Sequence, residues 1–364
     1  MSWPTVNLGE ILSFKYGSAL KKEDRRSGNY PVMGSNGRVG SHDEGSTTGA
    51  TIVIGRKGSI GEIVYSETSC WPIDTTYFVS SKETVQDLRW LYWQLKGAGL
   101  NNMNRGAAIP GLNREDAYAV SVLLPPLPEQ RRIAAILDQA DELRTKRRRA
   151  LTLLDELADS LFLSEFGTVG TANRADLHKL GEVAVIKSGS TPDRSRSDFY
   201  GGSIPWVKTG EVKGQLIMAT EESVTETGRL AARLQLFPEG AIVIAMYGQG
   251  KTRGQSAPLG IGATVNQACA VILPNARFET SFMTHQLRLA YDRLREKARG
   301  GNQANLNLGL VGDLDILLPS IDAQAVFGMR LAKLNRLRVA MRSQVREIDE
   351  LFASLQHRAF RGEL

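Results

Sequence analysis

The segment of this sequence that comes nearest to a catalytic motif is 245–252 (AMYGQGKT). It has the residue order of a phosphate-binding loop, with Ala in place of the first Gly. In an enzyme that hydrolyses nucleotides, Lys251 would bind a phosphate. Such a loop needs a helix directly after Lys-Thr, because the helix N-terminus faces the phosphates. Segment 253–258 (RGQSAP) cannot form that helix. We therefore expect a polar, basic, flexible loop, and a nucleotide-binding enzyme remains an alternative interpretation.

Other residue types that carry catalysis show no productive spacing. The four histidines, His42, His178, His285 and His357, are scattered along the chain. Two cysteines cannot build a four-thiolate zinc site, and no Gly-x-Ser-x-Gly sequence is present. The Asn/Asp-Pro-Pro-aromatic motif of amino-methyltransferases is also absent. The sequence thus predicts a binding protein that has no catalytic residue, metal or cofactor of its own.

Side chains that can bind nucleic acid gather in polar loops, and the chain has a net charge of +6. Arg and Lys bind phosphates or guanine, while Asn and Gln form paired hydrogen bonds with adenine. The predicted DNA-binding residues of the first half are Asn36, Arg38, Arg56, Lys57, Asn104 and Arg105. Those of the second half are Lys208, Thr209, Tyr247, Gln249, Lys251, Arg253, Arg299, Asn302 and Gln303.

An internal repeat shows which elements position these loops. Segment 154–161 (LDELADSL) recurs as 348–355 (IDELFASL), 194 residues later. Upstream, Gly17-Ser18 corresponds to Gly189-Ser190, and the apolar run 52–54 corresponds to 242–244. An ordered series of matches along both halves predicts a duplicated architecture. Its parts are a first globular domain (1–125), a first long helix (126–167), a second globular domain (168–318) and a second long helix (319–364).

The short β-branched runs of each globular part predict a mixed α/β domain. Segments 126–167 and 319–364 have apolar residues in alternating steps of four and three, which predicts two long helices. That spacing is typical of a coiled-coil seam. Because the helices leave their domains in turn, they can pack together only antiparallel. The predicted fold class is α+β, with two similar mixed α/β domains, an antiparallel coiled coil and pseudo-two-fold symmetry. The predicted seam consists of Ile136, Ala140, Leu143, Leu154, Leu157, Leu161, Leu334, Leu337, Met341, Ile348, Leu351 and Leu355.

Segment 124–133 (LPPLPEQRRI), followed by the heptads, resembles the start of the spacer helix in specificity subunits of Type I restriction–modification enzymes. The second copy, 318–324 (LPSIDAQ), keeps the Pro and the Gln but has Ala in place of the Glu. This resemblance covers essentially the whole chain. It implies a non-catalytic, cytoplasmic DNA-recognition subunit in which each domain reads one half of a split, asymmetric site on double-stranded DNA and the helices set the spacing.

The same resemblance implies partners. Two methyltransferase subunits would bring S-adenosylmethionine, and two restriction subunits, where present, would bring ATP and Mg. The residues expected at the partner interface are Pro128, Glu129, Gln130, Asp155, Glu156, Asp349 and Glu350. No membrane partner is expected, because no apolar run is long enough to span a bilayer. A coiled-coil scaffold without sequence-selective DNA binding remains a second alternative.

Overall fold

The computed structural model describes residues 3–103, 111–171, 176–299 and 304–364. It divides into two compact units. Unit 1 comprises Met1–Ala150 and Met341–Leu364, and unit 2 comprises Leu151–Ala340. The predicted Asn104, Arg105, Asn302 and Gln303 lie outside the described residues.

Unit 1 contains two small sheets and a two-stranded ribbon that closes the domain. The ribbon pairs β1 (Thr5–Asn7) with β9 (Ser121–Leu123). The larger sheet has the order β2-β8-β5-β6, and the smaller has the order β4-β3-β7. Their strands are β2 (Lys15–Tyr16), β3 (Tyr30–Gly34), β4 (Gly37–His42), β5 (Thr51–Gly55), β6 (Ile63–Ser66), β7 (Trp71–Pro72) and β8 (Thr76–Ser80). The helices are α1 (Leu8–Ile11), η1 (Lys22–Asp24), α2 (Leu88–Gly97), η2 (Leu100–Asn102), α3 (Arg114–Tyr118) and the start of α4 (Leu127–Phe166).

Unit 2 repeats this plan. Its ribbon pairs β10 (Leu177–Lys179) with β18 (Asp315–Leu317), and its sheets have the orders β11-β17-β14-β15 and β13-β12-β16. The strands are β11 (Ile186–Ser188), β12 (Tyr200–Val207), β13 (Glu222–Val224), β14 (Ile242–Ala245), β15 (Ser256–Pro258), β16 (Thr264–Val265) and β17 (Cys269–Ile272). The helices are α5 (Leu180–Val183), η4 (Ser197–Phe199), η5 (Thr209–Glu211), α6 (Glu226–Ala231), α7 (Thr280–Leu289), α8 (Tyr291–Lys297), α9 (Leu308–Gly312) and the start of α10 (Ile321–Ala359).

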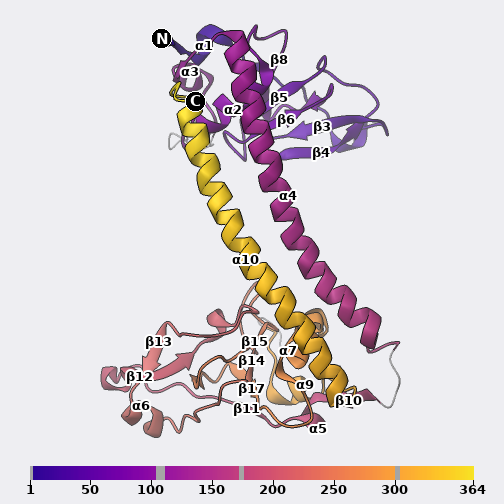
Figure 1. Cartoon of the computed structure of the whole chain (residues 1–364), viewed down its shortest axis with the longest axis vertical. Helices are drawn as coiled ribbons and strands as arrows, with labels where there is room; N and C mark the ends of the chain where they lie inside the picture. Colours follow the sequence, from indigo (N-terminus) through magenta and orange to yellow (C-terminus); the bar gives the residue numbers. More distant parts are fainter. Residues whose placement is uncertain (1–2, 104–110, 172–175, 300–303) are drawn as a thin grey trace. The chain divides into compact units, whose positions relative to one another are not determined.

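The apolar runs that mark the repeat become the central strands β5 and β14, which are buried along their whole length. Alternate side chains of a strand point to opposite faces. Ile52 and Ile54 therefore join the core beneath α2, while Val53 packs with Met33 and Cys70 of the smaller sheet side. Strand β14 divides its side chains between two cores in the same way. In each unit the larger sheet lies between the smaller sheet and the long helices (Figure 1).

The repeated Gly-Ser pair has a structural cause. A Cβ atom on Gly17 would lie 2.1 Å from the carbonyl oxygen of Ile73, and one on Gly189 would lie 1.7 Å from that of Val265. No side chain fits at either position, because both glycines press against backbone. The following serine completes the contact in each unit, since Ser18 N donates to Pro72 O (3.0 Å) and Ser190 N donates to Val265 O (3.2 Å).

The repeated Gln of the spacer motif joins the long helix to its domain. In unit 1 the side chain of Gln130 accepts a hydrogen bond from Asp87 N (2.8 Å) and donates to Pro125 O (2.9 Å). In unit 2 Gln324 accepts from Glu279 N (2.9 Å) and donates to Pro319 O (2.8 Å). Both side chains are buried. Asp87 and Glu279 in turn cap α2 and α7, so the Gln fixes one helix end against the next.

We expect Gln324→Ala to lower the free energy of unfolding of unit 2 by about 2 kcal/mol, because two buried backbone groups lose their partner. Urea unfolding of the full chain measures the loss of stability. Hydrogen exchange of the α7 amides shows that the loss lies in unit 2. Gln215→Ala, at an exposed position of unit 2, is the matched control and should change the stability little. Equal stability of both variants would contradict the role given to Gln324.

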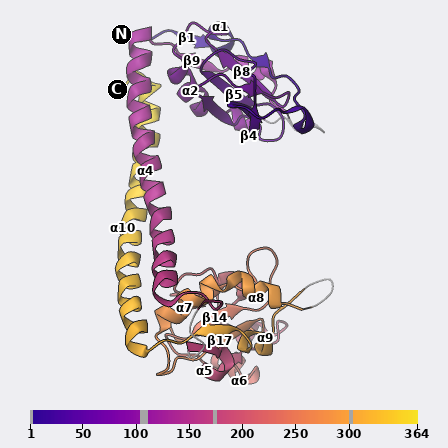
Figure 2. The ribbon, with the colours of Figure 1, turned by 90° about the vertical axis from the view of Figure 1, so that its right-hand side faces the viewer.

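The long helices α4 and α10 run antiparallel where they meet within each unit. In unit 1, Arg144 Nε donates to Asp349 Oδ1 (3.0 Å), and Arg147 Nη1, further along α4, donates to the earlier residue Gln344 (3.2 Å). In unit 2, Arg338 Nη2 donates to Leu154 O (3.0 Å), and Arg330 Nη1 donates to Glu165 Oε2 (2.7 Å). Figure 2 shows both helices along their length. The antiparallel pairing predicted from the sequence is confirmed.

The predicted seam is correct in one of its two columns. Ala140, Leu154, Leu161, Leu334, Met341, Ile348 and Leu355 are all partly buried. Leu143, Leu157, Leu337 and Leu351 are instead 44–67% exposed, and the next residue along each helix is more buried. The second column therefore contains Leu137, Arg144, Leu151, Ala158, Leu331, Arg338, Val345 and Phe352. Of the residues predicted in that column, Ile136 is partly buried beside the fully buried Leu137.

Arginine explains this shift of one residue next to Leu143 and Leu337. The Arg144 guanidinium lies 4.1 Å from the ring centre of Phe352 and binds Asp349. Arg338 binds Leu154 O and the carboxylate of Asp155 (2.9 Å). A long arginine can cover apolar surface with its stem while its charged end reaches a partner, so it fills a seam position that a hydrophobicity pattern assigns to the neighbouring leucine.

Candidate nucleic-acid interface

Two of the predicted loops of unit 1 lie side by side because they share one acceptor. The carbonyl oxygen of Thr75 accepts hydrogen bonds from Ser35 Oγ (3.2 Å), Arg56 N (3.0 Å) and Lys57 N (3.1 Å). The β3–β4 hairpin, which carries Asn36, and the loop after β5 are thereby joined. The structure thus brings predicted residues from two separate segments onto one surface.

The side chains on this surface differ in their exposure and in the hydrogen bonds that already hold them. Asn36, Arg38 and Lys57 are exposed. Arg38 Nε donates to Gly40 O (3.1 Å), which holds the guanidinium along its own strand. Arg56 is half-buried, donates to Asp74 O (2.6 Å) and lies over the ring of Tyr16. These contacts preset the direction of both arginines.

In unit 2, the loop after β14 is a connection between antiparallel strands. Ile244 pairs with Ser256, so strand β15 and no helix follows Thr252. The expectation that this segment cannot form the helix of a phosphate-binding loop is confirmed. Tyr247, Gln249 and Lys251 are exposed at the tip of this connection.

Helix α8 holds the second half of that loop, which leads into β15. Tyr291 Oη donates to Lys251 O (2.9 Å), and Arg295 Nη1 donates to Arg253 O (2.9 Å). Arg253 itself donates to Ala304 O and is only half-exposed. The exposed Arg299 pairs through its backbone with Asn305, in the segment that Arg253 contacts. The structure therefore joins Arg253 and Arg299 in one loop cluster, with the tip residues of the β14–β15 loop beside them.

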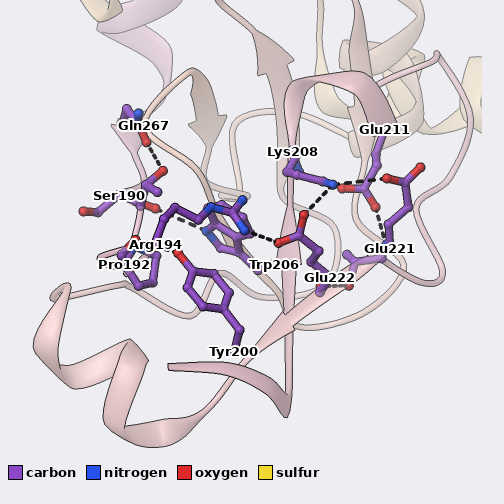
Figure 3. A network of polar contacts seen from close by, with 12 residues as sticks. Ser190, Pro192, Arg194, Tyr200, Trp206, Lys208, Glu211, Glu221, Glu222 and Gln267 are labelled. Atoms are coloured by element: carbon purple, nitrogen blue, oxygen red, sulfur yellow. Dashed lines mark hydrogen bonds and ion pairs between the residues drawn. The ribbon is translucent and has the colours of Figure 1, made fainter. Parts of the chain in front are cut away.

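Lys208 belongs to a separate, charge-paired network on β12 and β13 (Figure 3). Its Nζ atom lies 2.8 Å from Glu222 and 3.2 Å from Glu221. These hydrogen bonds raise the pKa of Lys208. The neighbouring Thr209 begins η5 and is half-buried. The charge of Lys208 is thus already balanced within the domain, which makes it a weaker phosphate ligand than its sequence context indicates.

The same network contains Arg194, which sequence reasoning missed. Its guanidinium lies 4.6 Å from the ring centre of Tyr200 and 4.9 Å from that of Trp206, and Nη1 is 2.6 Å from Glu222 Oε2 (Figure 3). Hydrogen bonds from Arg194 and then Lys208 lower the pKa of Glu222. A planar cation held between aromatic rings and a carboxylate presents its remaining donors in a fixed direction. No motif of fixed spacing marks it, since its partners come from separate strands.

The residues predicted at the partner interface are distributed over the long helices. Pro128, Glu156 and Glu350 are exposed, as is Asp155 beside Arg338. Glu129 binds Arg132, and Asp349 binds Arg144 and Arg148. Gln130 differs, because its side chain is 1% exposed and both of its polar atoms are bonded inside unit 1. A partner could reach Gln130 only by breaking those bonds, so its role is structural.

Within the described ranges, no group of three or more His, Cys, Asp or Glu side chains could hold a metal ion. Within the same ranges, no helix is both long and apolar enough to cross a membrane.

Comparison with known proteins finds the same family model twice, once in each half of the chain. Residues 2–153 and 176–348 each match the family model described as Type I restriction modification DNA specificity domain. The specificity subunit of the Type I restriction enzyme EcoR124I/EcoR124II of Escherichia coli is 27% identical over 149 residues, which are 40% of this chain and 37% of that protein. The match therefore spans little more than a third of that relative's length.

Two further proteins are similar over nearly the whole chain. The specificity subunit of the Type I restriction enzyme MjaVIII of Methanocaldococcus jannaschii is 20% identical, with 100% of this chain and 93% of that protein covered. The crystal structure of a Type I restriction-modification S subunit from M. genitalium superposes with a TM-score of 0.62 at 17% identity, covering 98% of this chain and 96% of that one. At this identity the superposition shows a common fold.

Proposed function

Because both halves match its model, this chain belongs to the Type I restriction modification DNA specificity family, and we propose that it gives such a complex its DNA sequence preference. The observation that carries the proposal is the duplication of one domain plan with polar, basic loops clustered in each copy. Each unit would read one half of a split, asymmetric site on double-stranded DNA. The chain would act by binding in the cytoplasm, with no catalytic step of its own.

In this proposal the long helices set the distance between the half-sites and bind two methyltransferase subunits. Exposed residues such as Pro128, Glu156 and Glu350 support that role, since they lie on the helices outside the domain cores. Glu129 is half-buried and binds Arg132 on the same helix. The methyltransferase subunits would supply S-adenosylmethionine. Two restriction subunits, where present, would supply ATP and Mg. A duplicated chain can offer a similar surface twice, which suits two identical partners.

We expect loop substitutions in one unit to alter one half-site alone. Asn36→Ala with Arg38→Ala should relax base preference in the first half-site, and Gln249→Ala with Lys251→Ala should relax it in the second, each by about tenfold. These side chains are exposed, so the folds should be retained. Adenine methylation mapped on a randomised DNA library, with each variant in the assembled complex, measures both preferences at once.

Two outcomes would contradict the proposal. Equal selectivity of the methyltransferase subunits with and without this chain would assign recognition elsewhere and leave a scaffold role. Loss of ATP binding in Lys251→Ala, with unchanged DNA selectivity, would instead favour the nucleotide-binding alternative.

A further inference from the structure

Unit 1 contains an open cavity of about 370 Å³ beside the joined loops. Its walls include Tyr16, Tyr77, Arg56, Lys57, Arg114 and Glu115. Three of these side chains are cations and one is a carboxylate. Two of the cations, Arg56 and Lys57, follow β5 directly, so the cavity continues the surface that carries Asn36.

The rings of Tyr16 and Tyr77 form the floor of this cavity. They are the outer end of a stack of aromatic rings that continues into the core through Phe14 and Tyr118. The ring centres of Tyr118 and Phe14 lie 5.3 Å apart, those of Phe14 and Tyr77 lie 5.5 Å apart, and those of Tyr77 and Tyr16 lie 5.0 Å apart. Phe14 N donates to Tyr118 Oη (2.7 Å), which fixes the inner end of the stack. At its outer end, the side chain of Tyr16 is 52% exposed. The floor is therefore anchored and ends at the surface.

Both arginines lie against this floor. Their Cζ atoms are 5.2 Å (Arg56) and 5.9 Å (Arg114) from the ring centre of Tyr16. The carboxylate of Glu115 lies 3.5 Å from Arg114 Nε, at the long end of an ion pair. Among the described residues, no carboxylate forms an ion pair with Arg56 or Lys57. The positive charge here is held in place by rings and backbone, whereas that of Lys208 in unit 2 is balanced by Glu221 and Glu222.

We propose that this cavity binds one backbone phosphate of DNA. The inference rests on the proposed function and adds to it a contact that carries no base preference. Guanidinium groups bind phosphate oxygens in a planar, paired geometry, and a lysine adds a point charge. The three cations and one carboxylate of the lining give the cavity a net charge of +2. This charge suits an anionic phosphodiester better than a neutral base edge. Because the cavity adjoins the loops that carry Asn36 and Arg38, the phosphate would fix their register on the duplex.

The equivalent place in unit 2 lacks these groups. Tyr16 pairs with Tyr77 across β2 and β8, while the matching pair across β11 and β17 is Ser188 with Ala270. Asn113, which caps α3, corresponds to Asn307, which caps α9, so that Arg114 is replaced by Leu308. The cavity is thus a property of the first recognition domain, and the two domains would hold the DNA backbone differently.

The test measures DNA affinity of the assembled complex against salt concentration. Lys57→Gln and Arg114→Gln should each weaken binding to target and to unrelated DNA alike, by about tenfold, and should reduce the slope of log affinity against log salt by about one. Lys82→Gln is the matched control, since Lys82 is an exposed lysine of the same unit outside the cavity. It removes the same charge and should change neither quantity appreciably. Thermal unfolding of each variant checks that the fold is retained.

Neutral methylphosphonate links, placed one at a time along the duplex, locate the contact. One position should weaken binding of the unmodified complex and have no further effect on Lys57→Gln. Equal affinity and equal salt slope for Lys57→Gln, Arg114→Gln and Lys82→Gln would overturn the inference, even where inorganic phosphate alone binds the chain. Equal affinity of the unmodified complex for target and unrelated DNA would refute the proposed function. That result is distinguishable from failure of the inference, because the cavity is tested by affinity and salt slope on unrelated DNA as well.

Discussion

Removal of one heptad from each long helix should shorten the unread gap between the half-sites by about three base pairs and leave both half-sites unchanged. Seven helical residues rise by about 10 Å, and three base pairs of DNA cover a similar length. Deleting 147–153 from α4 and 340–346 from α10 removes segments that face each other, because Arg144 lies opposite Asp349 and Leu154 opposite Arg338. Methylation mapped on DNA with gaps of different length measures the preference.

The deletion spares the contacts that hold each helix to its domain. Gln130 and Gln324 keep their bonds, and Arg144 keeps Asp349. DNA turns by about 100° over three base pairs, so we expect weaker binding along with the new optimum. Deleting 147–153 alone is the control, because it breaks the pairing register and should abolish a defined gap. If the variant that lacks both segments prefers the same gap as the unmodified chain, the helices do not set the spacing.

The sequence was most informative where the duplication constrained it. Gly17 and Gly189 appear as a matched pair, and so do Gln130 and Gln324, because each pair makes the same backbone contact in its unit. A repeat therefore marks contacts that both copies need. A repeat does not show the role of those contacts: the resemblance places Gln130 at a partner surface, whereas its side chain is buried inside the domain.

Heptad spacing found one column of the seam and missed the other. Leu143 and Arg144 are neighbours, and hydrophobicity favours the leucine, but the ring of Phe352 and the carboxylate of Asp349 together favour the arginine. These partners are about 200 residues away in the sequence, so a local pattern cannot include them. The same limit applies to Lys208, whose charge is balanced by carboxylates on another strand.

The cavity residues were hidden for a similar reason. Arg56 and Lys57 were found because they follow a strand in a polar loop. Tyr16 and Arg114 were not, because one lies in a two-residue strand and the other begins a short helix nearly a hundred residues later. Only the fold of unit 1 brings both to the same cavity.

His285 in α7 is a buried titratable group between the long helices of unit 2. Its ring centre lies 5.5 Å from that of Phe162 and 5.3 Å from that of Phe327, and its side chain is 7% exposed. Nε2 lies 3.4 Å from Asp159 Oδ1, which Arg288 also binds. Burial, followed by the positive charge of Arg338, lowers the pKa of His285 to about 4. The folded unit therefore holds this imidazole neutral at pH 7.

Unit 2 should lose stability as the pH falls below the ordinary histidine range. An unfolded chain protonates this histidine near pH 6.5, whereas the folded unit does so only near pH 4. The part of the free energy of unfolding that depends on His285 is therefore fully present above pH 6.5. It is lost progressively as the pH falls to 4, by about 3 kcal/mol in all. Hydrogen exchange of α7 at pH 7.5 and pH 5 measures the loss. His285→Leu should remove most of this dependence, while His357→Gln, at an exposed position of α10, should retain it. The same pH dependence in His285→Leu as in the unmodified chain would mean that His285 titrates normally, and that the carboxylates beside it cause the change.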